Sequence, residues 1–229
     1  MTDASDGDLS CPEPGAAVTA ELEARRRRIV AHPWTWLRQV HGARVVEVDA
    51  PGEWSGAEAD AAVTTTPGAV LAVHTADCAG VALVGDCEDP VTGEPVRVLG
   101  VAHAGWRGLQ AGVLEATVDL MRRLGAHDVV WDLGACISPA AYEFGESDLD
   151  ELCDQFGAEL RSSTLDGAPA LDLRAGVRSA LERCGVRGPG PEVVPCTALD
   201  DGFYSWRARR DVGRQATVGW LESAVHRLR

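Results

Sequence analysis

The fold class of this chain is best indicated by one apolar stretch, Ala69-Val-Leu-Ala-Val-His-Thr-Ala-Asp-Cys-Ala-Gly-Val-Ala-Leu-Val-Gly85. It holds two apolar runs, at about residues 69–74 and 80–85, separated by a turn that carries Asp77 and Cys78. Short apolar runs rich in β-branched residues are typical of strands that are buried on both faces. The stretch is too short and too interrupted to span a membrane. We therefore predict two buried strands with Asp77 and Cys78 between them.

The flanking segments alternate between strand and helix patterns, which favours an α/β fold. Strands are expected at residues 39–48, 61–65, 96–102 and 129–133, with closing strands at 193–196 and 216–221. Helices are expected at 21–31, 109–124, 147–161 and 174–184. We expect a polar hairpin loop at 86–95, a frayed or strand-poor start at 1–18, and a linker at 188–191. Since too little chain follows this linker to form a second domain, residues 1–229 are interpreted as a single domain.

Composition and charge restrict the class of partner. The formal net charge is −14, which argues against nucleic acid or an anionic membrane as the main partner. An anionic substrate would need a locally positive pocket. The seven cysteines include no Cys-x-x-Cys pair, and residues 1–15 lack the pattern of a signal peptide. A reduced, cytoplasmic location is expected.

Three residues stand out as candidate metal ligands. His41 lies in Gln39-Val-His-Gly42, Cys78 follows Asp77, and His103 opens His103-Ala-Gly-Trp-Arg-Gly108 at the end of a predicted strand. Two imidazoles and a thiolate suit zinc, with a fourth position open for water or substrate. Taken singly, each histidine has a structural explanation and Cys78 could be an inert core thiol. His74 competes for a ligand role because it lies close to Cys78 in sequence.

Two arginine-containing segments are candidates for binding an anion. Arg107 and Gly105 lie where a strand leads into a helix, and helix N-termini attract anions. Near the C-terminus, Phe203-Tyr-Ser-Trp-Arg207 combines aromatic rings, a hydroxyl and a guanidinium, with more arginines following. The second segment could bind a nucleobase or a phosphate, or could be a surface ion-pair patch.

Together these motifs resemble the laccase-domain family, also called the YfiH or multicopper polyphenol oxidase family. The resemblance rests on Q-V-H-G, A-D-C and H-A-G-W-R-G in this order, and on Cys196-Thr197, Phe203–Arg207 and Gly213-Arg214 near the C-terminus; it covers about residues 37–221. It implies an α/β fold, a single domain built as a layered α/β/β/α sandwich with mixed sheets. It also implies one metal ion, best taken as zinc, bound by His41, Cys78 and His103.

The resemblance implies purine nucleoside phosphorylase activity on adenosine, inosine and methylthioadenosine, with adenosine deaminase activity in some members. Purine nucleosides and phosphate are thus the expected partners. The older family label is copper-dependent polyphenol oxidation, and a related fold carries cysteine hydrolases whose Cys-His pair would fall on Cys78 and His103. Only six histidines are present, three of them in polar contexts, so the separate histidine clusters of a multicopper oxidase cannot be formed and copper is the less favoured metal.

On this basis we assign expected roles. Cys78, His103 and Asp77 are the candidate catalytic residues, with Asp77 either setting the geometry of a ligand or acting in proton transfer. The candidate substrate- and phosphate-binding residues are Arg107, Arg207, Ser205 and Gly105. Ala208 stands where the family pattern has a second arginine, and this departure bears on substrate range more than on metal binding.

Overall fold

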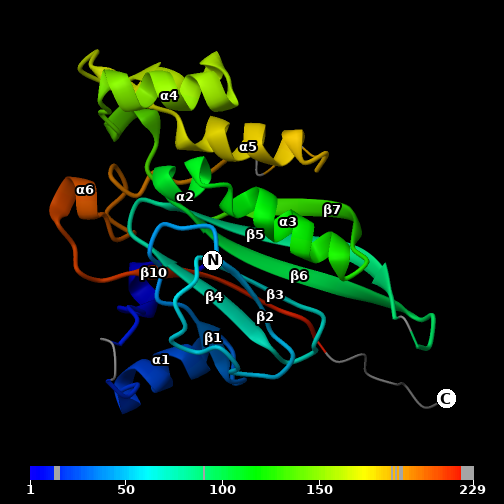
Figure 1. Ribbon diagram of the computed structural model, residues 1–229. Helices are drawn as coiled ribbons and strands as arrows, with labels where there is room; N and C mark the ends of the chain where they lie inside the picture. Colours follow the sequence, from blue (N-terminus) through cyan, green and yellow to red (C-terminus); the bar gives the residue numbers. More distant parts are fainter. Residues whose placement is uncertain (13–15, 90, 187, 189, 191–192, 223–229) are drawn as a thin grey trace.

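Two β-sheets lie face to face between two layers of helices (Figure 1). The computed structural model describes residues 1–12, 16–89, 91–186, 188, 190 and 193–222. In sheet order, the larger sheet consists of β2 (Val45–Glu47), β3 (Ala61–Thr64), β6 (Pro95–Ala104), β5 (Ala79–Glu88) and β7 (His127–Leu133). The smaller sheet consists of β1 (Trp34–Trp36), β4 (Val70–Thr75) and β10 (Gln215–Trp220). Each contains one parallel pair, β2 with β3 and β1 with β4, and is otherwise antiparallel, so both sheets are mixed.

The helices are divided between the two outer faces. α1 (Ala20–Ile29) covers the smaller sheet, and the other layer lies over the larger sheet (Figure 1). That layer contains α2 (Trp106–Gln110), α3 (Val113–Arg123), α4 (Glu146–Phe156) and α5 (Leu173–Arg183). A short hairpin of β8 (Arg161–Ser163) and β9 (Pro169–Leu171) and the one-turn helix α6 (Trp206–Arg209) complete the regular elements. The α/β/β/α sandwich with mixed sheets is thus confirmed.

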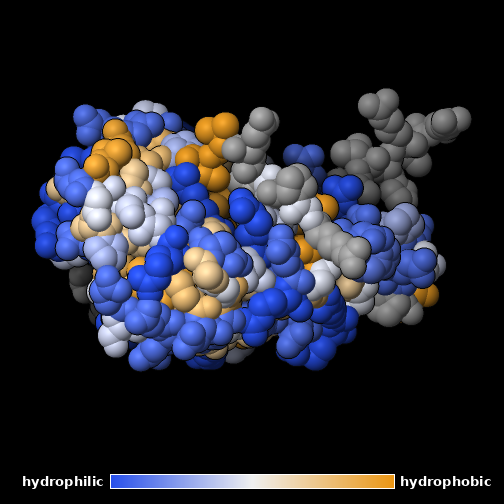
Figure 2. Space-filling view, turned by 90° about the horizontal axis from the view of Figure 1, so that it is seen from above, coloured by the Kyte–Doolittle hydropathy of each residue, from blue (hydrophilic) through white to orange (hydrophobic). Residues whose placement is uncertain are grey.

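Strand β4 shows why the apolar stretch at 69–85 determines this architecture. All its residues are buried, and alternate side chains enter different cores. Leu71 and Val73 pack between the two sheets, whereas Val70 and Ala72 pack on the side of α1. A strand covered on both faces needs apolar residues at every position rather than at alternate ones. The outer surface over α4 and α5, which faces solvent, is mostly hydrophilic (Figure 2).

The predicted strand at 39–48 is wrong over most of its length. Only β2 forms, and residues 39–44 are a loop in which His41 has a φ of 60°. The N–H groups of Val40, His41 and Gly42 all donate to the carboxylate of Asp60 rather than to a neighbouring strand. A buried carboxylate that gathers three consecutive amides bends the chain, and a strand is then impossible there.

The described part of residues 1–18 is strand-poor, as expected, but it is not frayed. Leu9 is fully buried in the core beneath α1, and Thr2 exchanges hydrogen bonds with Ala216 of β10. The expected strand at 193–196 is reduced to a single bridge between Cys136 and Cys196. The strands β1, β8 and β9 were not predicted, because three residues each are too few for a periodic pattern.

The remaining elements agree with the prediction except at their ends. The helix expected at 109–124 is divided into α2 and α3 at Gly112, which adopts a left-handed φ of 87°; Gly125, with a φ of 91°, follows the end of α3. α4 ends before Gly157 (φ 119°) and is followed by a short 3-10 turn, so the helix expected at 147–161 is shorter than predicted. The linker at 188–191 lies partly outside the described residues. Within the described part of the chain, no helix is long and apolar enough to cross a membrane.

Candidate metal and substrate site

Strand pairing brings the sequence motifs to one edge of the larger sheet. β5 and β6 pair so that Ala79 lies opposite Ala104, which places Cys78 beside the end of β6 that carries His103. β3 pairs with the other side of β6, with Ala61 opposite Ala102, so Asp60 is also adjacent to His103. Residues far apart in sequence therefore converge because three strands begin or end at the same edge.

His41, Cys78 and His103 form a group whose potential ligand atoms lie within 4.8 Å of one another. The sulfur of Cys78 is 3.7 Å from Nε2 of His41. Tetrahedral zinc with bonds of about 2.0–2.3 Å places its ligand atoms roughly 3.3–3.6 Å apart, so the Cys78–His41 pair is already close to the required spacing and the group as a whole would contract around the ion. His41 is exposed and His103 is buried, so the group is accessible from one side. We call these three residues the metal-ligand group, because together they could hold a metal ion.

Asp60 orients both histidines and was missed by the sequence analysis. It is fully buried; Oδ1 accepts from Nδ1 of His103 at 2.9 Å and from the amide of His41 at 2.9 Å. Burial alone would raise the pKa of this carboxyl, but hydrogen bonds from His103, Gly42 and Val40 hold it below the ordinary value. With Nδ1–H directed at Asp60, the neutral form of His103 presents the lone pair of Nε2 to the group, as carboxylate–histidine–metal arrangements require.

Cys78 and His103 shift each other's pKa in opposite directions. Burial would raise the pKa of the Cys78 thiol, but the charge of His103 and hydrogen bonds from both histidines lower it to about 6. Burial would likewise lower the pKa of His103, but Cys78 and Asp60 raise it to about 9. The thiolate, which is the form that binds metals and attacks electrophiles, is therefore the dominant state at neutral pH.

Gly105 allows the loop before α2 to approach the metal-ligand group. A Cβ at this position would lie 2.7 Å from Cδ2 of His41 and 3.0 Å from the sulfur of Cys78. These distances are shorter than side chains tolerate without movement of both ligands. The predicted importance of Gly105 thus has a steric reason, although direct contact with substrate stays a prediction.

Asp77 joins the turn before Cys78 to the C-terminal motif. It has a φ of 100°, which is a strained conformation for a residue with a side chain. Its Oδ1 accepts from the hydroxyls of Thr197 and Ser205, each at 2.7 Å, and its Oδ2 accepts from the amide of Arg207 at 2.6 Å. The strain is offset by these hydrogen bonds, so Asp77 fixes the turn that presents Cys78.

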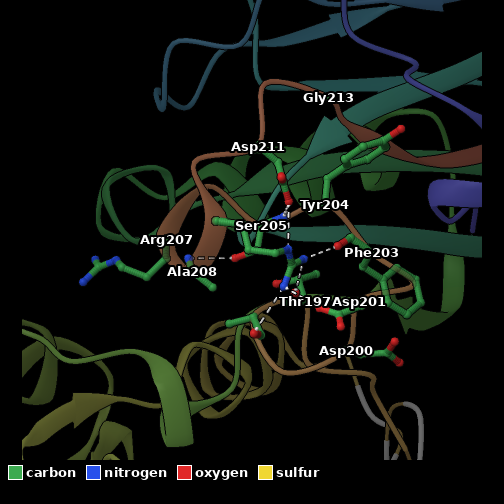
Figure 3. Close-up of polar contacts among 12 residues, drawn as sticks. Thr197, Asp200, Asp201, Phe203, Tyr204, Ser205, Arg207, Ala208, Asp211 and Gly213 are labelled. Carbon is green, nitrogen blue, oxygen red and sulfur yellow. Dashed lines mark hydrogen bonds and ion pairs between the residues drawn. The ribbon is translucent and has the colours of Figure 1, made fainter.

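Ser205 is occupied in the same network. It is fully buried, donates to Asp77, and caps α6 by accepting from the amide of Ala208 at 3.1 Å (Figure 3). Its own amide donates to Asp211, which also pairs with Arg209 at 3.1 Å. Arg209 further donates to the carbonyl oxygens of Thr197 and Phe203. The predicted contact between Ser205 and substrate stays a prediction, whereas this network stabilises the loop.

Arg107 and Arg207 each place an exposed guanidinium beside an aromatic ring, and neither lines the pocket that contains His41, Cys78 and His103. Arg107 lies 4.2 Å above the ring of Trp106, and Arg207 lies 5.0 Å from the ring of Tyr142. Both side chains are exposed, and that of Arg207 extends away from the Ser205–Asp211 contacts (Figure 3). Burial and then Cys78 raise the pKa of the Tyr142 hydroxyl above its usual range, against the opposing charges of Arg207 and Arg107. Tyr142 therefore lies within electrostatic reach of both arginines and of Cys78, and it too was missed by the sequence analysis.

A pocket of about 600 Å³ opens beside the three candidate ligands. Its lining includes His41, Cys78 and His103 together with Trp206, whose side chain is 47% exposed. His74 also lines it but does not join the ligand group; its Nδ1 lies 3.2 Å from the sulfur of Cys11, and burial lowers its pKa to about 3. A larger pocket, of about 1280 Å³, lies between β5, β6 and β10 and is lined by none of the predicted site residues.

The fold and the site together place this chain among α/β/β/α proteins that carry a His–Cys–His group at the edge of the larger sheet. Residues 8–222 match the family model described as multi-copper polyphenol oxidoreductase laccase, so the chain belongs to this family and the resemblance seen in the sequence is confirmed.

Similar proteins that match most of this chain are named purine nucleoside phosphorylase. A purine nucleoside phosphorylase of Streptomyces coelicolor is 40% identical over 92% of this chain and 84% of its own length. One from Mycobacterium tuberculosis is 34% identical over 89% of this chain and 80% of its own length.

Solved structures share the fold. The Neisseria meningitidis protein NMB0706 superimposes with a TM-score of 0.75 at 32% identity, covering 94% of this chain and 86% of its own. YlmD from Geobacillus stearothermophilus gives a TM-score of 0.74 at 27% identity, covering 93% and 85%.

Proposed function

We propose that this chain is a zinc-dependent purine nucleoside phosphorylase that acts on adenosine, inosine and methylthioadenosine. The observation that carries the proposal is the His41–Cys78–His103 group, which opens on a pocket large enough for a nucleoside. Arg107 and Arg207 lie outside the lining of this pocket, but both act electrostatically on Tyr142, as Cys78 does. The names of the relatives from Streptomyces and Mycobacterium support the same activity.

Zinc is the metal we assign to this group. One thiolate and two imidazoles match its preferred donors, and the exposed side of the group leaves a fourth position for substrate. Bound there, zinc would act as a Lewis acid that polarises a substrate oxygen. Asp60 holds His103 in the required tautomer, and Gly105 leaves room for His41 and Cys78 to converge.

Arg107 and Arg207 are assigned to the phosphate. The chain carries a net charge of −14, so a dianion needs local positive charge to enter the site. Each guanidinium rests on an aromatic ring, Trp106 or Tyr142, which limits its motion and lowers the entropy lost when phosphate binds. Arg207 is further anchored by donating to the carbonyl of Glu143 at 3.1 Å.

Trp206 is assigned to the purine base. It lines the pocket that contains the metal-ligand group, and about half of its side chain is exposed and available for stacking. Ser205 caps α6 and is tied to Asp77, so the position of Trp206 is coupled to that of Cys78 through two hydrogen-bonded residues.

In the reaction, a phosphate oxygen forms a bond to C1′ of the ribose as the bond from C1′ to the base breaks. Positive charge develops on the ribose, and the base takes up a proton as it leaves. The arginines hold the attacking anion in line, which is a positioning contribution. Asp77 acts as a positioning residue because its carboxylate already accepts three hydrogen bonds within the protein. Adenosine deaminase activity would produce inosine at the same site without phosphate.

A cysteine hydrolase is the second candidate function, favoured by one observation. Cys78 has a pKa of about 6 and lies beside His103, which is oriented by Asp60, so the three resemble a nucleophile, a base and an orienting carboxylate. Such an enzyme would keep its activity after the metal is removed.

The test is chromatographic measurement of base release from adenosine, inosine and methylthioadenosine, with and without phosphate. We expect phosphate-dependent release by the wild-type protein and by Cys153→Ala, a control in the outer helix α4, but none by Cys78→Ala. Zinc content, measured on the same preparations, should fall only in Cys78→Ala. Failure of the wild type to release any base would refute the proposal. Hydrolytic activity that survives removal of the metal by a chelator would favour the cysteine hydrolase.

Cytoplasmic location and the absence of a nucleic-acid partner stay predictions.

A further inference from the structure

Cys136 and Cys196 form the isolated parallel bridge that joins the segment after β7 to the segment before α6. The amide of Cys136 donates to Pro195 O and the amide of Thr197 donates to Cys136 O, each at 3.3 Å. Directly paired residues of neighbouring strands lie about 4.8 Å apart and direct their side chains to the same face. Disulfides join residues whose Cα atoms are roughly 4.4–6.8 Å apart, so this backbone pairing is compatible with a bond between the two thiols.

The two thiols differ in a way that suits successive oxidation steps. Cys196 is half-buried, and its sulfur accepts from the amide of Ser138 at 3.2 Å. Burial would raise its pKa, but this and other amide donors, from Ala198 and Leu199, hold the pKa below its ordinary value. Cys136 is fully buried, and burial raises its pKa to about 11. A partly exposed thiol of lowered pKa beside a buried thiol is typical of a redox-active pair.

Arg174 supplies positive charge to this pair. Its Nη2 donates to the carbonyl oxygens of Cys136 and Pro195, each at 3.0 Å. Its Nε is buried and has no partner among the described residues. A guanidinium in this position opposes the increase that burial causes in the pKa of Cys136, and it would stabilise the Cys136 thiolate.

We propose that Cys136 and Cys196 are a peroxide-sensitive dithiol. The Cys196 thiolate attacks a hydroperoxide, so that a sulfur–oxygen bond forms, the oxygen–oxygen bond breaks, and water or an alcohol leaves after protonation. The Cys136 thiolate then attacks the resulting sulfenic sulfur, the disulfide bond forms, and hydroxide leaves and is protonated to water. The dithiol is oxidised by two electrons and the peroxide is reduced by two.

A disulfide bond between Cys136 and Cys196 would affect the turn that carries Asp77 and Cys78. Thr197, next to Cys196, donates its hydroxyl to Asp77, and Ile137, next to Cys136, donates its amide to the carbonyl of Asp77 at 2.9 Å. Both cysteines are thus one residue away from the anchors of the residue that precedes Cys78. Formation of a disulfide should shift these anchors and loosen the turn, and a bound metal ion should leave severalfold faster.

Peptide mapping of the metal-loaded, full-length protein after hydrogen peroxide treatment tests the chemistry. We expect linked peptides that contain Cys136 and Cys196 and that separate on treatment with dithiothreitol. Cys136→Ala should stop at a sulfenic acid on Cys196, trapped by dimedone, whereas Cys184→Ala should still form the link. Oxidation of other cysteines without this link would overturn the proposal.

Metal release tests the connection to Asp77 separately from nucleoside turnover. Oxidised and reduced wild-type protein would be mixed with a chromophoric chelator, and the rate of colour formation compared. The oxidised form should release its metal severalfold faster, and dithiothreitol should restore the slower rate. Equal rates for the two forms would refute the transmission to the turn, whatever the enzyme's substrate proves to be.

Discussion

Replacing Asp60 with asparagine should weaken both the fold and the metal site, by amounts that follow from its four accepted hydrogen bonds. Oδ1 accepts from His41 and His103, both at 2.9 Å, and Oδ2 accepts from Val40 at 3.2 Å and Gly42 at 2.8 Å. Asparagine keeps one acceptor oxygen and places an amide group against the other pair of donors. Two hydrogen bonds to a charged group are lost, at roughly 1.5–3 kcal/mol each, so the free energy of unfolding should fall by about 3–6 kcal/mol.

The metal affinity should fall as well, because His103 loses the partner that fixes its tautomer. Loss of such an orienting group typically lowers affinity about 10–100-fold. The assay is competition for zinc with a chromophoric chelator, run beside chemical denaturation of the metal-free protein. Glu58→Gln is the matched control, since it lies two residues away and loses only an exposed ion pair with Arg38, worth at most about 1 kcal/mol. If Asp60→Asn binds zinc as tightly as Glu58→Gln, the orienting role assigned to Asp60 is wrong.

Three further predictions concern the same site. Gly105→Ala should lower zinc affinity, because the new Cβ would meet His41 and Cys78, whereas Gly145→Ala, which meets nothing within 4 Å, should leave it unchanged in the same chelator assay. In chelator-treated protein, alkylation of Cys78 followed by peptide mapping should be half-maximal at pH about 6, on a plateau above it and about tenfold slower for each further unit of acidity; a midpoint near 9 would refute the stabilisation by His103. Trp206→Ala should raise the KM for inosine about 5- to 150-fold, the worth of one stacking contact, with Trp206→Phe close to wild type; an unchanged KM in the alanine variant would remove Trp206 from the base site.

Local patterns predicted the strands and helices that have enough residues to show a period. β4 and β5 were recognisable because strands covered on both faces must be apolar throughout, and α3 because its buried positions recur at helical spacing. The three candidate ligands were recognisable because each lies in a motif through which the sequence resembles the family. Their convergence depends on strand register, which local composition does not reveal.

The failures have a common physical origin in long-range polar contacts. The pattern around His41 alternates like a strand, yet the chain bends there because Asp60 collects its amides. Asp60 itself lies between an acidic loop and an apolar strand, and nothing nearby in sequence marks it as buried. Thr2 and Ala216 form their hydrogen bonds across almost the whole chain, so no local signal could predict that the start of the chain is ordered.

Phosphorus NMR of a reaction containing inosine and phosphate tests the proposed phosphorolysis at its reacting bond. We expect ribose 1-phosphate to appear in an amount equal to the hypoxanthine released, in the wild type and not in Cys78→Ala. Hypoxanthine without a sugar phosphate would show that water is the nucleophile. Equal product from both proteins would show that the reaction does not depend on the His41–Cys78–His103 group.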